Sequence, residues 1–340
     1  MTRFEEVQEA LRQSPRRWLV TGVAGFIGSG LLEHLLKLGQ EVVGIDNFSA
    51  GKPENLEDVQ AIVGREAWSR FTFIEADILD MDRCREACHG TQVVLHQAAL
   101  GSVPRSIKLP EAFHAANVDG FVNMLIAARD AGVDAFVYAS SSSVYGDSQG
   151  LPKVEESIGN PLSPYALTKS INEQYANLFA RVYGFQGVGL RYFNVFGPRQ
   201  DPNGAYAAVI PKWIAQMRAG RTCEIYGDGE TSRDFCFVKN VVQANLLAAL
   251  APTPARGRVY NVACCQSTTL NQLFLALREG LGPCVPGLAN QSPIYLEGRE
   301  GDIRHSLADL SSITARLGYQ PTHAFAQGIA ETLTWVTGSR

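Results

Sequence analysis

The stretch WLVTGVAGFIG runs from Trp18 to Gly28. Residues 18–23 form a short apolar run that reaches glycine, as a buried parallel strand does. A helical pattern of leucines follows from Leu31 to Leu38, and Gly39 closes it. This order predicts a strand, a glycine turn and a helix, which is the first unit of an α/β fold.

The same alternation continues along the chain. We expect further strands at 41–46, 71–77, 92–99, 135–140 and 187–192, with helices at about 112–131 and 165–182. Strands that alternate with helices predict a doubly wound parallel sheet of the Rossmann type, covered on both faces. Beyond residue 194 prolines and glycines become frequent and strands shorter, which indicates a smaller α/β C-terminal lobe.

Composition limits the function classes. Net charge is −4, which offers no broad basic surface and argues against nucleic acid as a partner. No apolar run reaches the ~18 residues that span a membrane, and residues 1–17 read as an extra amphipathic helix at 3–14 rather than a targeting peptide. The seven cysteines lack a C-x-x-C pair or a nearby histidine set, so we expect reduced thiols, a cytoplasmic protein and no metal site.

The glycine turn predicts a dinucleotide site. Gly22, Gly25 and Gly28 are spaced GxxGxxG, which lets backbone N–H groups approach a pyrophosphate at a helix N-terminus. Asp46 ends the second predicted strand, about 20 residues on, where a carboxylate accepts from both ribose hydroxyls. Arginine does not neighbour Asp46, so NAD is favoured over NADP. We therefore expect a NAD-binding domain at 1–194 and a second, smaller lobe at 195–340, from which the chain can cross back.

A tyrosine–lysine pair suggests the chemistry. Tyr165 and Lys169 are four residues apart and lie on one face of a predicted helix. A phenol with a pKa near ~10 is a poor base at neutral pH, but an adjacent cation lowers that pKa. The pair could therefore take a proton from a sugar hydroxyl.

Together these motifs resemble the extended short-chain dehydrogenase/reductase superfamily, and most closely its nucleotide-sugar 4-epimerases of the UDP-N-acetylglucosamine type. The resemblance covers about residues 17–320. It is carried by TGVAGFIG, Asp77-Ile78, HQAA, SSSSVYG, YxxxK, RYFNVFGP, RDFCFV and REGD. It implies an NAD-dependent isomerase that acts on UDP-sugars, with residues 195–340 as the nucleotide-sugar-binding lobe.

The resemblance also implies roles for single residues. Tyr165 would be the base at the 4-hydroxyl, Lys169 would hold the nicotinamide ribose, and Ser141, flanked by Ser142 and Ser143, would bond the 4-oxygen. The implied cofactor contacts are Gly22, Gly25, Phe26, Ile27, Gly28, Asp46, Asn47, Asp77, Ile78, Gln97, Ala98, Ala99, Asn117, Tyr165, Lys169 and Tyr192. The implied substrate contacts are Gly101, Ser102, Ser141, Ser142, Ser143, Tyr165, Asn194, Gln200, Ala208, Val209, Tyr226, Arg233, Arg299, Asp302 and Ser306.

Two departures narrow the reaction. Sugar 4,6-dehydratases in the superfamily carry Asp-Glu where this chain has Ser142 and Ser143, and serine hydroxyls cannot supply that acid–base chemistry. Gly101 and Ser306 stand where galactose-restricted epimerases carry a lysine and a tyrosine, which leaves room for an N-acetyl group. The expectation is a UDP-N-acetylglucosamine/UDP-N-acetylgalactosamine 4-epimerase that works through a 4-keto sugar, with UDP-glucose/UDP-galactose or uronic-acid forms as further substrates.

Three alternatives stay open. One is another NAD-dependent nucleotide-sugar enzyme, a dehydratase, decarboxylase or reductase. The second is a dehydrogenase that releases NADH in each cycle, and the third is a non-catalytic NAD-sensing protein. The resemblance also implies a homodimer formed through the helices at 112–131 and 165–182.

Overall fold

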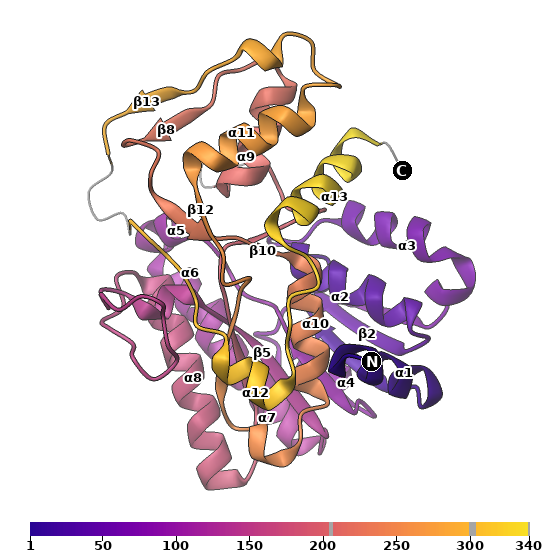
Figure 1. Cartoon of the computed structure of the whole chain (residues 1–340). Helices are drawn as coiled ribbons and strands as arrows, with labels where there is room; N and C mark the ends of the chain where they lie inside the picture. The colour runs from indigo at the N-terminus through magenta and orange to yellow at the C-terminus, as the bar shows by residue number, and fades with distance from the viewer. Residues whose placement is uncertain (204–206, 299–303, 339–340) are drawn as a thin grey trace.

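A seven-stranded parallel sheet forms the centre of the molecule (Figure 1). The structure is a computed structural model that describes residues 1–203, 207–298 and 304–338. The strand order is β11-β6-β5-β4-β1-β2-β3. The strands are β1 (Arg17–Thr21), β2 (Glu41–Asp46), β3 (Phe71–Glu75), β4 (Val93–His96), β5 (Ala135–Ser141), β6 (Val188–Tyr192) and β11 (Val259–Val262).

Helices cover both faces of this sheet. One face carries α1 (Arg3–Gln13), α2 (Phe26–Lys37), α3 (Pro53–Trp68) and α10 (Val238–Ala249). The other carries α4 (Met81–Cys88), α7 (Gly120–Asp130) and α8 (Pro164–Tyr183). Alternate residues of each strand enter the two cores, Trp18 and Val20 on the first face and Leu19 on the second. The predicted doubly wound sheet is confirmed.

The chain returns to the sheet after residue 194. Helix α10 packs against α1 and α2, and β11 pairs with β6 at the edge of the sheet. Buried side chains line α10 along its whole length, because sheet and neighbouring helices enclose it. The sheet and the helical layer on its first face therefore contain residues from before and after residue 194.

The C-terminal lobe lies at one end of the sheet (Figure 1). Its core joins α9 (Val209–Arg218), α11 (Leu270–Leu281) and α13 (Phe325–Thr337) around Trp213 and Phe274. Short strands pair two by two: β7 (Val195–Phe196) with β10 (Cys236–Phe237), β8 (Glu224–Tyr226) with β13 (Ile294–Leu296), and β9 (Ser232–Asp234) with β12 (Ser267–Thr269). Helix α12 (Ser311–Leu317) packs beside β11.

The helix predicted at 112–131 has an irregular first half. It consists of α6 (Pro110–His114), a π-helical segment η1 (Ala115–Asp119) and α7, preceded by α5 (Val103–Lys108). Single π-helical turns within helices are frequent at functional sites. Short 3₁₀ turns lie at η2 (Ser142–Tyr145), η3 (Thr253–Ala255) and η4 (Leu288–Asn290). In the described part of the chain, no helix has both the length and the apolar character needed to cross a bilayer.

Local signals explain where α8 begins and ends. The Ser163 hydroxyl accepts a 3.1 Å bond from the backbone N–H of Ala166, and Pro164 occupies the first turn. Gly184 ends the helix in the left-handed conformation. The N-cap fixes the first turn of α8, which carries Tyr165 at the carboxyl edge of the sheet.

Candidate functional site

The glycine turn between β1 and α2 has no room for side chains. Gly22 has φ +65°, and a Cβ there would lie 2.9 Å from the Cα atom of Ala98. A Cβ on Gly28 would lie 2.0 Å from the carbonyl oxygen of Gly22. Bare backbone at the N-terminus of α2 suits a pyrophosphate. This part of the chain therefore fits a dinucleotide.

Asp46, at the end of β2, is fastened to the same turn. Its Oδ2 accepts a 2.9 Å bond from Ala24 N–H, and its Oδ1 accepts a 2.8 Å bond from Phe48 N–H. Burial raises the pKa of Asp46, and these backbone bonds partly offset the shift. A carboxylate has about four acceptor positions, so Asp46 keeps capacity for ribose hydroxyls.

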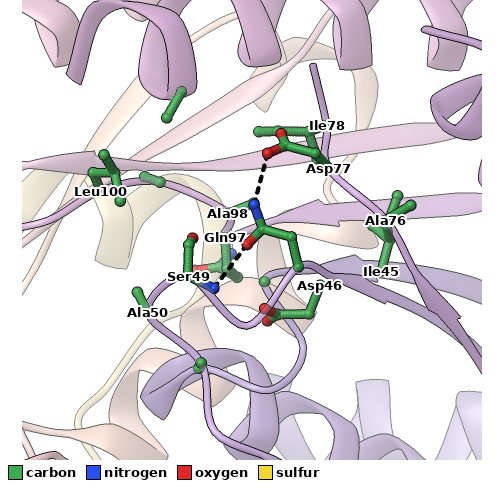
Figure 2. A pocket seen from close by; sticks show the side chains of 16 residues that line it. Ile45, Asp46, Ser49, Ala50, Ala76, Asp77, Ile78, Gln97, Ala98 and Leu100 are labelled. Carbon is green, nitrogen blue, oxygen red and sulfur yellow. Dashed lines mark hydrogen bonds between the residues drawn. The ribbon is translucent and has the colours of Figure 1, made fainter. Parts of the chain in front are cut away.

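A pocket of about 110 Å³ opens beside Asp46 at the carboxyl edge of the sheet (Figure 2). Asp46, Asp77 and Leu100 lie around it, at or just beyond the ends of three different strands. Most predicted cofactor residues line it, namely Gly22, Gly25, Asp46, Asn47, Asp77, Ile78, Gln97, Ala98 and Ala99. Sequence reasoning missed Ile45, Ser49, Ala50, Gly51, Ala76, Leu100 and Ala116. The position of Ser49 to Gly51, a few residues after the end of β2, was the sequence signal that could have identified them.

Asn47 and Asp77 close one side of this pocket. Asn47 Nδ2 donates a 2.7 Å hydrogen bond to Asp77 Oδ2, and Asn47 Oδ1 accepts from Ser49 N–H at 3.0 Å. The second dashed bond in Figure 2 reaches the loop at Ser49. The segments that follow β2 and β3 are thereby held together. The side chains of Phe26 and Ile27 pack against the core of the C-terminal lobe, and the cofactor contact predicted for these two residues stays a prediction.

A buried polar triangle stands behind the pocket. The Tyr192 hydroxyl donates to Gln97 Oε1 at 3.0 Å and accepts from Asn245 Nδ2 at 2.9 Å, and Gln97 Nε2 donates to Asn245 Oδ1 at 3.1 Å. Burial raises the pKa of Tyr192, so the phenol stays neutral. Tyr192 was predicted to touch the cofactor, but the structure places it beside Gln97 rather than among the residues that line the pocket. Asn245 was missed, because nothing in its sequence context marks it.

Asn117, in the π-helical segment, acts as a brace. Its Oδ1 accepts from Leu100 N–H at 2.7 Å, and its Nδ2 donates to Leu100 O and to Thr168 Oγ1, both at 3.1 Å. Asn117 is buried. It therefore connects the loop after β4 to α8, next to the predicted catalytic pair.

The predicted serines form a compact hydroxyl turn at the end of β5. Ser141 Oγ accepts from the backbone N–H of Ser143 at 3.1 Å and lies 3.1 Å from Ser143 Oγ. Ser141 is buried, while Ser142 and Ser143 are half-buried in η2. Helix α8 packs against η2. This contact brings the serines to the first turn of α8.

Tyr165 lies in that first turn. Its ring meets the edge of Phe113, with centroids 6.3 Å apart and an interplanar angle of 88°. Burial raises the pKa of Tyr165, and a hydrogen bond with Ser141 partly offsets the increase. We expected an adjacent cation to lower this pKa. In the structure burial raises the pKa instead, so the protein alone leaves the phenol protonated at neutral pH.

Lys169, one turn further on, is 3% exposed. Its Nζ donates a 2.9 Å hydrogen bond to the carbonyl oxygen of Ala139 in β5. Burial lowers the pKa of Lys169 to about 8, and the charge of Glu173 opposes the shift. Sequence reasoning missed Glu173, although its place four residues after Lys169 was a signal.

Several predicted substrate residues gather where β6 and β9 end. The carbonyl oxygen of Asn194 accepts from Cys236 N–H at 3.2 Å, and the backbone of Asn194 is left-handed, with φ +31°. Arg233 Nη1 donates to the carbonyl oxygen of Arg304 at 3.3 Å. Ser306 N–H donates to Ser232 O at 3.1 Å, so Ser306 and Arg233 share one side of the lobe.

Other predicted substrate residues in the described part of the chain lie away from this group. Gln200 Nε2 donates to Val195 O at 3.0 Å, and Gln200 lines a separate cavity of about 500 Å³ between α3, α9 and α13. Gly101 is exposed, and a Cβ there would have no neighbour within 4 Å among the residues that the structure describes. The remaining positions are Ser102, which caps α5, Ala208 and Val209, which begin α9, and Tyr226, which ends β8. Arg299 and Asp302 lie outside the described residues.

Metal ligation was not expected. Over residues 1–203, 207–298 and 304–338, no cluster of three or more histidine, cysteine or acidic side chains is placed to hold an ion. His96, the first residue of HQAA, instead lies 3.0 Å from Thr21 Oγ1 and packs against Phe136 in the core.

Comparison with known proteins places this site in a family. Residues 18–263 match the NAD dependent epimerase/dehydratase family. The UDP-glucose 4-epimerase of Mycolicibacterium smegmatis is 39% identical over 320 residues, which are 93% of this chain and 97% of that protein.

Two solved structures have the same fold. A UDP-N-acetylglucosamine 4-epimerase from Methanobrevibacter ruminantium, in complex with UDP-N-acetylmuramic acid, superposes with a TM-score of 0.87 at 38% identity, covering 96% of this chain and 99% of that one. DesIV, a dTDP-glucose 4,6-dehydratase from Streptomyces venezuelae with NAD bound, gives a TM-score of 0.83 at 30% identity, covering 95% and 98%. With the glycine turn and Asp46 in place for NAD, the chain belongs to the NAD dependent epimerase/dehydratase family.

Proposed function

We propose that this protein is an NAD-dependent UDP-sugar 4-epimerase that interconverts UDP-N-acetylglucosamine and UDP-N-acetylgalactosamine. The observation that carries the proposal is the hydroxyl turn Ser141–Ser143 packed against the Tyr165 end of α8. This turn presents hydrogen-bonding groups where a dehydratase needs an acid and a base. The names of the M. smegmatis and Methanobrevibacter relatives support the same reaction class.

In the proposed mechanism, Tyr165 removes the proton from the sugar 4-hydroxyl and Ser141 holds the 4-oxygen. NAD, when bound, supplies the acceptor and donor for the hydride at C4. Tyr165 then returns the proton to the 4-oxygen of the rotated 4-keto sugar, so C4 is inverted. In this proposal Lys169 holds the nicotinamide ribose, and its positive charge favours the phenolate. The hydrogen bond with Ser141 opposes the rise in the Tyr165 pKa that burial causes.

The nucleotide end anchors the substrate in this proposal. Asn194 and Arg233 hold the diphosphate, for which a guanidinium is well suited. By resemblance, Arg299 also grips the diphosphate and Asp302 lies beside the uridine ribose. Both residues lie outside the described part of the chain. Binding energy is used far from C4, so the hexose stays free to rotate.

By the resemblance, we assign the N-acetyl group to the substrate side of the site, near Gly101 and Ser306. Among the described residues, none lies within 4 Å of a Cβ on Gly101, and Ser306 is a small residue attached to the β9 backbone. UDP-glucose, UDP-galactose and uronic-acid forms would fit the same space as secondary substrates.

A homodimer is part of the proposal. Helix α8 exposes the apolar side chains of Leu167, Leu178, Val182 and Tyr183, at 49%, 40%, 59% and 54%. Apolar side chains on one long surface helix favour packing against a second copy. Analytical ultracentrifugation tests this directly, and a monomer at micromolar concentration would contradict it.

To test the proposed reaction, purified protein is incubated with UDP-N-acetylglucosamine or with UDP-N-acetylgalactosamine. The sugar nucleotides formed are then separated by chromatography. Conversion in both directions supports the proposal. Elimination of water to a 4-keto-6-deoxy sugar would instead support the dehydratase alternative that DesIV represents.

A further inference from the structure

Glu173 on α8 is buried in a network directly behind the predicted catalytic residues. Its Oε1 accepts from Ser140 Oγ at 2.5 Å and from Arg191 Nε at 2.9 Å, and its Oε2 accepts from Arg191 Nη2 at 2.8 Å. The Arg191 and Glu173 side chains are 4% and 11% exposed. A two-pronged ion pair this deep fixes the geometry of all three groups.

The network fastens α8 to two strands. Ser140 of β5 and Arg191 of β6 are register partners in the sheet. Glu173 hydrogen-bonds both residues, so it connects α8 to two adjacent strands of the sheet. The neighbours of Ser140 in β5 are Ala139, whose carbonyl oxygen holds Lys169, and Ser141, which belongs to the hydroxyl turn. A loss of the tie would therefore displace Lys169 relative to Ser141.

Charge gives Glu173 a second effect. Lys169 is enclosed, and an ammonium group in such a place is destabilised unless a counter-charge is near. Glu173 is the acidic group that opposes this penalty. Arg191 acts in the opposite sense, because it neutralises part of the charge of Glu173.

Other titratable groups surround the pair. His96 on β4 has its pKa lowered to about 3 by burial and by the charge of Lys169, and burial raises the pKa of Tyr138 on β5. Tyr145, whose ring lies 4.9 Å from the Arg191 guanidinium, has a pKa of about 12 because of burial. These three groups stay neutral near the titration of Lys169. Glu155, whose backbone carbonyl accepts from Arg191 at 2.9 Å, also faces the network.

We propose that Glu173 is a positioning residue of the epimerase: it ties α8 to β5 and β6 and supplies the negative charge that keeps the Lys169 ammonium protonated in place. The inference rests on the proposed function of Lys169. It adds a role to a residue that need not touch either substrate or cofactor.

Two variants that break the same ion pair distinguish this role from a purely structural one. Glu173→Gln removes the negative charge and leaves Arg191 positive, so both changes disfavour a charged Lys169. Arg191→Gln leaves Glu173 unneutralised, which favours a charged Lys169. The titration midpoint of the Lys169 Cε resonance is measured by NMR, with assignment by its absence in Lys169→Met.

From a midpoint near 8, we expect a fall of about one pH unit in Glu173→Gln and a rise in Arg191→Gln. The alkaline limb of the kcat profile should move in the same direction as the midpoint in each variant. Equal shifts of the same sign, or no shift in either, would overturn the inference. Ser140→Ala keeps both charges and loses one hydrogen bond, so its midpoint should stay within a few tenths of a unit.

If Glu173→Gln fails to fold because Arg191 is left buried and unpaired, the comparison uses Arg191→Met and the double variant Glu173→Gln/Arg191→Met. The double variant should then titrate at lower pH than Arg191→Met, and equal midpoints would overturn the inference. The NMR midpoint does not depend on turnover. A protein that shows these shifts but epimerises neither N-acetylhexosamine would refute the proposed function alone.

Discussion

The Lys169 ammonium donates a 2.9 Å hydrogen bond to the carbonyl oxygen of Ala139, two residues before Ser141 in the same strand. One contact therefore relates the helix that carries Tyr165 to the strand that carries the hydroxyl turn. Since the two elements meet at this point, changes there should alter the position of Lys169 relative to the hydroxyl turn.

Removal of the Tyr165 hydroxyl should abolish turnover. Tyr165→Phe keeps the ring against Phe113 and deletes the proposed base. We expect kcat to fall at least about 100-fold, in line with the loss of a general base. The Kd for UDP-N-acetylglucosamine, measured by calorimetry, should stay within about threefold, because the nucleotide supplies most of the binding. An active variant would remove Tyr165 from the mechanism.

The glycine turn offers a matched pair of variants for NAD binding. Gly28→Ala places a Cβ 2.0 Å from the Gly22 carbonyl oxygen, so the turn must open and NAD affinity should fall at least about tenfold. Gly30→Ala lies on the same helix, where the new Cβ meets Val238 Cγ2 at 3.5 Å, an ordinary contact. It should bind NAD normally and be stabilised by up to about 1 kcal/mol. Equal NAD retention in both purified proteins would contradict the assigned turn.

Sugar selectivity should depend on Ser306. Ser306→Tyr fills the space assigned to the N-acetyl group, so kcat/KM for UDP-N-acetylglucosamine should fall at least about tenfold while that for UDP-glucose changes little. Ser311→Tyr, at the exposed start of α12, is a control for added aromatic bulk. Equal losses on both sugars would show that Ser306 does not contact the 2-substituent.

His34 should make the protein sensitive to acid. Within the described part of the chain, its buried Nε2 has no hydrogen-bond partner. Its ring stacks on Phe4 of α1, and burial lowers its pKa from 6.5 to about 4. Between these values the unfolded chain binds more protons than the folded one. Stability is therefore lost as pH falls from about 6.5 to 4, by about 2 kcal/mol.

Urea unfolding at several pH values measures this effect. His34→Leu should reduce the slope of unfolding free energy against pH in that window, and His89→Leu, at an exposed position, should leave it unchanged. Identical slopes in wild type and His34→Leu would assign the acid sensitivity to other groups.

The sequence was sufficient to predict the site elements that follow strands. Glycine turns, Asp46 and the Tyr165–Lys169 pair depend on local spacing, because parallel strands bring their carboxyl ends to one edge. The Ser141 turn follows the same rule. Predicting these positions required no information about contacts between distant parts of the sequence.

Features that depend on long-range packing were not predictable. Glu173 meets Ser140 and Arg191 only because β5 and β6 pair in one register. Asn245 reaches Gln97 and Tyr192 because α10 returns to the sheet, although Asn245 lies 53 residues after Tyr192 in the chain. The pKa of Tyr165 is also set by burial, which a spacing of four residues does not reveal.

The central claim is reversible inversion at C4 with NAD retained by the protein. The most direct test incubates purified protein with UDP-N-acetylgalactosamine alone, with no nicotinamide nucleotide added, and follows sugar composition and nicotinamide absorbance together. We expect one equilibrium mixture with UDP-N-acetylglucosamine, reached from either sugar, without accumulation of NADH. Conversion that requires added NAD⁺ and releases one NADH per sugar would contradict the account.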